Sequence, residues 1–63
     1  MNFKVGDTVQ IIDNKSILRG AREYIGKTAV ITSVHPNSAP PHYHINIDNG
    51  VYKWNNESLI LQD

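Results

Sequence analysis

Three histidines, His35, His42 and His44, are the residues of this sequence whose types and spacing best suit chemistry. Neutral imidazole binds Zn²⁺, Cu²⁺ or Ni²⁺, and two histidines one residue apart on a β-strand point to the same face of a sheet. His35 joins that pair only if the connection over residues 36–41 closes with His35 opposite His42. If the connection closes one residue shorter, His35 points to the other face. The sequence leaves both registers of this hairpin open.

The two registers also predict different core residues in the strand that precedes the connection. Successive side chains of a strand point to opposite faces, so fixing His35 fixes the others. With His35 opposite His42, the residues that face the core are Val30, Thr32 and Val34. With the shorter closure they are Ala29, Ile31 and Ser33.

No other side chain completes a metal site at these histidines. The chain has no cysteine, which excludes disulfides and thiolate ligands. Asp48 lies six residues after His42 on the same strand face, about 20 Å away at the usual rise per residue. Because a zinc site needs four ligands, or three and a water, we expect no metal and no other cofactor, and a solvated histidine face.

Strand patterns run through the chain, and no long helical pattern interrupts them. Alternating or β-branched apolar residues predict five strands, over residues 8–12, 27–34, 43–48, 51–54 and 59–61. Short strands at this spacing predict an all-β fold, either a small barrel or a sandwich. The 63 residues make one domain, residues 1–63, and a hydrophobic content of 40% allows a compact but thin core.

The dipeptide Asn49-Gly50 is the clearest turn signal. Both residues tolerate the positive φ of a type I′ turn, which joins the two strands of a hairpin. A two-residue loop sets Ile45 opposite Trp54, and it divides the side chains between two faces. The face expected in the core carries Tyr43, Ile45, Ile47, Tyr52 and Trp54. The face expected in water carries His42, His44, Asn46, Asp48 and Lys53.

A connection of 14 residues, from Asp13 to Gly26, separates the first two strands. Loops of this length are usually functional or contain a turn of their own. Ser16 is a candidate cap for a helical turn through Arg19, which Gly20 would interrupt. Four apolar or aromatic residues are expected to pin the connection to the core: Ile17, Leu18, Tyr24 and Ile25.

The order of four segments resembles that of small SH3-like barrels of bacterial and phage proteins: "VGDTVQII", "GKTAVITSV", "YHINIDNG" and "WNNESLIL". The second segment is similar to the KOW-type strand of ribosomal and transcription-factor SH3-like domains, with Ala29 where the KOW motif has glycine. The resemblance implies a five-stranded SH3-like barrel, in which residues 13–26 form a long, RT-type first loop. It also implies a 3₁₀ turn at "NNES". The "ALYDY" and Trp-Trp motifs of peptide-binding SH3 domains are absent.

SH3-like barrels bind extended peptides in a crevice between the first loop and the 3₁₀ turn. In this chain, Tyr24, Trp54 and Asn56 are the residues expected to contact a protein partner in that crevice. The sequence offers no Gly-rich phosphate loop and no nucleophile with a recognisable base, so we expect no enzymatic activity. The predicted function is a non-catalytic adaptor or accessory module that binds another protein.

Nucleic-acid binding is the alternative function, and it rests on four cations in or directly after the first connection: Lys15, Arg19, Arg22 and Lys27. They could meet the phosphates of RNA or single-stranded DNA while Tyr24 stacks on a base. The whole chain, however, has six basic and six acidic residues, so no net field steers it to nucleic acid. Protein binding is therefore preferred.

The sequence also bears on location. It contains no apolar run long enough for a signal peptide or a membrane span. Without cysteines, nothing in the chain requires an oxidising compartment. We expect a cytoplasmic monomer with no membrane partner.

Overall fold

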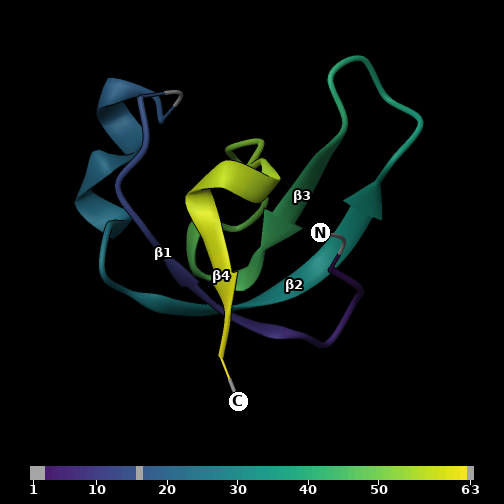
Figure 1. The fold of residues 1–63 in the computed structure, drawn as a ribbon, viewed down its shortest axis with the longest axis horizontal. Coiled ribbons are helices and arrows are strands. Elements are labelled where there is room, and N and C mark those ends of the chain that lie inside the picture. The colour runs from purple at the N-terminus through teal and green to yellow at the C-terminus, as the bar shows by residue number, and fades with distance from the viewer. Residues whose placement is uncertain (1–2, 16, 63) are drawn as a thin grey trace.

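The computed structural model describes residues 3–15 and 17–62, which form an antiparallel sheet with short 3₁₀ helices around it (Figure 1). The strands are β1 (Thr8–Ile11), β2 (Thr28–His35), β3 (His42–Ile45) and β4 (Leu59–Leu61). The 3₁₀ helices are η1 (Arg19–Tyr24), η2 (Asn46–Asp48) and η3 (Asn56–Ser58). The prediction of an all-β fold is confirmed.

The strands follow the order β3-β2-β1-β4, so β4 returns to pair with the first strand. Val9 of β1 lies opposite Leu61, and Ile11 lies opposite Leu59. The strands β3 and β4 stand at the two edges of this four-stranded sheet. Within the described residues, no helix has both the length and the apolar character that crossing a membrane requires.

The Asn49-Gly50 turn forms as predicted. Asn49 has φ 56° and Gly50 has φ 75°, and the backbone N–H of Val51 donates to the carbonyl of Asp48 at 3.1 Å. The residues before the turn differ from the prediction, because residues 46–48 wind into η2 instead of extending the strand. β3 therefore ends at Ile45.

The strand predicted over residues 51–54 is reduced to one isolated bridge between Tyr43 and Trp54. These two residues exchange backbone hydrogen bonds of 2.7 and 3.0 Å. Trp54 thus lies opposite Tyr43 rather than Ile45, and the predicted register is wrong by two residues. A shift of two leaves the two faces of β3 unchanged, so Tyr43, Ile45 and Trp54 are buried as predicted. His42 was expected in water and is buried, contrary to the prediction.

A β-bulge interrupts the pairing of β2 with β3. Ile31 lies opposite Ile45, and the next pair is Ser33 with His44. Two steps along β2 therefore match one step along β3, which leaves Thr32 as the extra residue. A bulge of this kind reverses which side chains face inward along the rest of the strand.

The bulge combines the two registers that the sequence leaves open. Before it, Ala29 and Ile31 are buried, as the shorter closure predicts. After it, Val34 packs against the core and His35 lies opposite His42, as the longer closure predicts. Each prediction is confirmed for one half of β2 and wrong for the other.

Apolar side chains from all four strands and from the first connection build the core. Its buried members are Phe3, Val9, Ile11, Ile17, Ala21, Ala29, Ile31, Tyr43, Ile45, Trp54 and Leu59. Tyr24 and Ile25 pack against it as predicted, whereas Leu18 is 66% exposed, contrary to the prediction. The expected cap, Ser16, lies outside the described residues, and η1 runs through Gly20 rather than stopping there.

Candidate functional site

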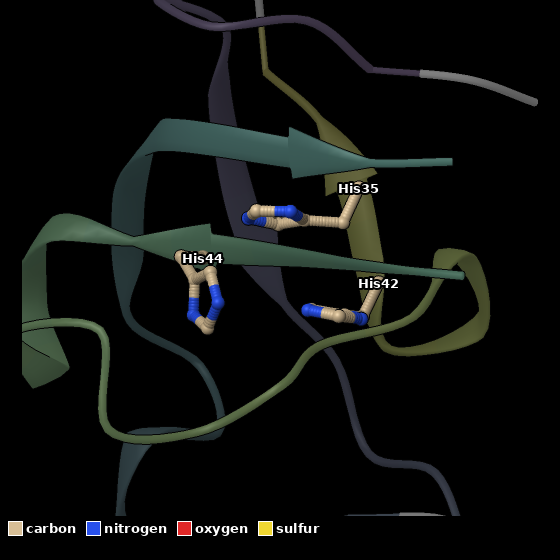
Figure 2. Close-up of side chains that lie close together, drawn as sticks. All are labelled: His35, His42 and His44. Atoms are coloured by element: carbon tan, nitrogen blue, oxygen red, sulfur yellow. The ribbon is translucent and has the colours of Figure 1, made fainter. Parts of the chain in front are cut away.

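The three histidines lie together on one face of the β2–β3 hairpin (Figure 2). The rings of His35 and His42 are stacked, with centroids 4.7 Å apart and 18° between their planes. The ring of His44 stands edge-on to both, at 5.1 Å from each. Figure 2 shows the rings of His35 and His42 extending along their strands toward His44. One nitrogen from each residue falls within 4.8 Å of the other two.

Backbone carbonyls fix the orientation of two of these rings. Nδ1 of His42 is 3.1 Å from the carbonyl oxygen of Pro40, and Nδ1 of His44 is 3.1 Å from that of Tyr52. A carbonyl oxygen can only accept a hydrogen bond, so each ring donates from a protonated Nδ1. In the neutral ring, the lone pair is then on Nε2.

His35 is held by a side chain of its own strand, since its Nε2 lies 3.1 Å from the hydroxyl of Ser33. Its pKa is lowered from the usual 6.5, first by loss of hydration and then by the nearby charges of His42, His44 and Lys53. The lowered pKa favours the uncharged form of His35.

Asp48 was expected in water, on the same face as His42 and His44, and this prediction is wrong. Its side chain is buried, because η2 breaks the strand alternation and turns the carboxylate inward. Oδ1 accepts from the backbone N–H of Gly50 at 2.9 Å. Oδ2 accepts from the backbone N–H of Tyr52 at 3.1 Å and from Nε1 of Trp54 at 2.9 Å. An Asp ahead of Asn-Gly is the one sequence signal for such a side-chain-closed turn.

The three residues expected to bind a protein do not line one common crevice in the structure. Trp54 is only 2% exposed, and its indole N–H ends on Asp48 rather than at the surface. Tyr24 is half-buried, with its ring 6.3 Å from that of Trp54. The crevice between the first connection and η3 has a volume of about 20 Å³. That is room for about one water molecule, and Asn56 does not line it.

A larger groove lies on the other side of η3, facing the connection over residues 36–41. It has a volume of about 530 Å³. In Figure 1, this connection is the loop at the upper right, and η3 is the short yellow-green turn to the left of β3. The residues that line the groove are Pro36, Pro40, Pro41, His42, Tyr43, Asn55, Asn56 and Glu57. Sequence reasoning missed this groove, although the proline cluster marks one of its walls.

The four cations in or directly after the first connection are all exposed, and two of them have contacts within the chain. Arg22 forms an ion pair of 2.8 Å with Asp13. The ammonium group of Lys27 lies 5.8 Å from the ring centroid of Tyr24. The ion pair reduces the net positive charge that this segment can offer to a phosphate backbone, whereas Lys27 keeps its charge.

The candidate site thus has two adjoining parts, a cluster of three histidines and a proline-walled groove, and His42 belongs to both. Comparisons with protein-family models, with curated proteins and with solved structures found no match.

Proposed function

We propose that this chain is a non-catalytic binding module with an SH3-like fold, and that its groove receives an extended segment of another protein. The observation that supports this proposal is the groove of about 530 Å³ between residues 36–41 and η3. Its volume falls within the range of about 300–1,000 Å³ that is typical of ligand pockets. The module is proposed to act as a cytoplasmic monomer.

The order of the elements supports the SH3-like part of the proposal. A strand, a long connection, two hairpin-linked strands, a turn and a 3₁₀ helix precede a last strand that pairs with the first. In the proposed barrel, the remaining strand corresponds to the segment of the bridge between Tyr43 and Trp54.

The lining of the groove suggests the chemistry of its occupant. Three prolines present rigid apolar surface, which loses little conformational entropy when a ligand packs on it. Asn56 is exposed at the rim and offers an amide for hydrogen bonds with an extended backbone. Glu57 adds a negative charge. A peptide with apolar residues and a lysine or arginine fits this surface.

Selection of displayed random peptides against the folded protein tests this proposal. Peptides that bind should lose about tenfold or more in affinity for an Asn56→Arg, Glu57→Lys variant, which blocks the rim and reverses its charge. Ile60→Arg is the matched control, because Ile60 is exposed on β4 and is not part of the lining. Peptides that bind the groove variant as tightly as the original protein would show that the groove is not the binding surface.

A titration with single-stranded RNA and DNA at two salt concentrations tests the alternative function, nucleic-acid binding. The proposal expects no salt-dependent binding. Binding that weakens with salt, and that is lost in a Lys15→Ala, Arg19→Ala variant, would replace the protein partner with a nucleic acid.

A further inference from the structure

We infer that His35, His42 and His44 bind one divalent transition-metal ion, with Zn²⁺ as the best match, through one imidazole nitrogen each. The cluster contains every histidine of the chain. It lies across two strands, and it adds a ligand-binding function to the proposed peptide groove.

The spacing of the nitrogens suits such an ion after a small adjustment. Zinc–nitrogen bonds of about 2.0–2.1 Å in a tetrahedral arrangement place the ligand atoms about 3.3 Å apart. The three nitrogens already lie within 4.8 Å of one another. Side-chain rotations that move the rings together by up to about 1.5 Å therefore close the site, and the β-sheet beneath them need not change.

Hydrogen bonds around the cluster prepare two of the rings for metal binding. Histidine ligands usually donate their second ring N–H to a carbonyl or carboxylate, which fixes both the tautomer and the ring orientation. His42 and His44 make this contact through Nδ1, with the carbonyls of Pro40 and Tyr52. Nε2 of each ring is then left with a lone pair. Histidines that only faced water would not need these two hydrogen bonds to backbone carbonyls.

The bulge at Thr32 brings the third ligand, His35, to the face that carries His42 and His44. Without the bulge, a regularly alternating strand of the same length that buries Ala29 and Ile31 would place His35 on the opposite face from His42. With it, His35 lies directly opposite His42, and the core of β2 is preserved. Three ligands from two paired strands make a more rigid site than the His42 and His44 pair alone.

The donor set selects the metal. Three neutral imidazoles suit Zn²⁺, Cu²⁺ and Ni²⁺, whereas Mg²⁺ and Ca²⁺ prefer oxygen ligands. The cluster identified within residues 3–15 and 17–62 includes no carboxylate. Three protein ligands leave a fourth position for water or an outside ligand. The charge of Lys53, which also acts on His35, opposes the positive charge of the ion.

Calorimetric titration with Zn²⁺, followed in parallel by NMR of the imidazole protons, tests the site. We expect one ion per chain and simultaneous shifts of all three histidine signals. His35→Gln and His44→Gln should each weaken binding by about tenfold or more, since losing a ligand costs at least as much as losing a group that orients one. Both residues are partly exposed, so these variants avoid the risk of unfolding that His42, 9% exposed, carries.

Two further variants complete the test. The triple glutamine variant has no imidazole and measures binding by carboxylates and the amino terminus. Lys53→Gln should strengthen Zn²⁺ binding by about threefold, because it removes a repelling charge. The inference is overturned if Zn²⁺ shows no saturable binding, or if His35→Gln binds as tightly as the original chain. The latter result would mean a two-ligand site at His42 and His44. Weaker binding in Lys53→Gln would place the ion elsewhere.

Discussion

The indole N–H of Trp54 donates a hydrogen bond of 2.9 Å to the carboxylate of Asp48, and both side chains are buried. The same carboxylate accepts the backbone N–H groups of Gly50 and Tyr52. One side chain therefore closes the Asn49-Gly50 turn and anchors it to the core.

Replacing Asp48 should destabilise the fold strongly. Asp48→Ala leaves three donors without their acceptor, and we expect the free energy of unfolding to fall by about 3 kcal/mol. Asp48→Asn should cost less, because the amide oxygen still accepts. Urea denaturation followed by the fluorescence of Trp54, the single tryptophan, measures both. Equal urea midpoints for the original chain and Asp48→Ala would contradict this role of the carboxylate.

Deleting Thr32 should remove the bulge and keep the histidine cluster. Ile31 and Ser33 would then become neighbours in a regular strand, with the same faces inward and outward as now. We expect a folded protein in which the rings of His35 and His42 remain in contact, with a loss of about 1 kcal/mol in unfolding free energy. Proton–proton NMR contacts between the two rings check this. Their disappearance would show that the bulge has another position.

The pKa of Tyr24 predicts an effect of high pH. It is raised above the usual 10.0, first by loss of hydration and then by the charges of Glu23, Asp48 and Tyr52. A raised pKa means that the folded state disfavours the ionised ring. Its contribution to stability is therefore complete below pH 10 and is lost as the pH rises through the folded pKa.

Alkaline denaturation curves measure this effect. The urea midpoint should fall less steeply above pH 10 in Tyr24→Phe, which retains the ring without the ionisable hydroxyl. Identical slopes for the variant and the original chain would assign the loss of stability to other tyrosines.

Gly20 permits the close approach of η1 to Tyr52. A Cβ at Gly20 would lie 2.7 Å from the hydroxyl oxygen of Tyr52. Gly20→Ala must therefore displace a ring that packs against Tyr24 and Trp54, and we expect a loss of about 1 kcal/mol. In a double-mutant cycle, adding Tyr52→Phe should recover part of that loss, because the clashing hydroxyl is gone. Additive losses in thermal denaturation would argue against the clash.

Local signals in the sequence predicted much of the fold. The alternation around Tyr43 and Ile45 identified a buried face, and Asn49-Gly50 identified a turn with positive φ. Both signals depend on only a few neighbouring residues. The predicted buried face and the predicted turn are therefore correct even though the strand pairing was predicted two residues away. The strand order is β3-β2-β1-β4, because β4 pairs with β1.

Features that depend on how two distant segments align with each other could not be predicted. Nothing about Thr32 itself marks it as a bulge, because the bulge arises from matching β2 to β3 after the core faces are satisfied. The groove likewise needs residues 36–41 and η3 to face each other. Asp48 was wrongly predicted to face water, because the alternating strand pattern of the sequence continues through the residues that form η2. In the structure, the carboxylate turns inward and accepts three hydrogen bonds.

As an inner strand of the sheet, β1 gains its two neighbours at different times during synthesis. β2 follows it after one connection, but the side chain of Gln62, next to β4, bonds to Gln10 across 52 residues of sequence. Contacts this distant form late, because the entropy of closing a long loop must be overcome first. A nascent chain therefore carries β1 with one open edge until Leu61 has emerged from the ribosome, and its sheet is completed only after that point.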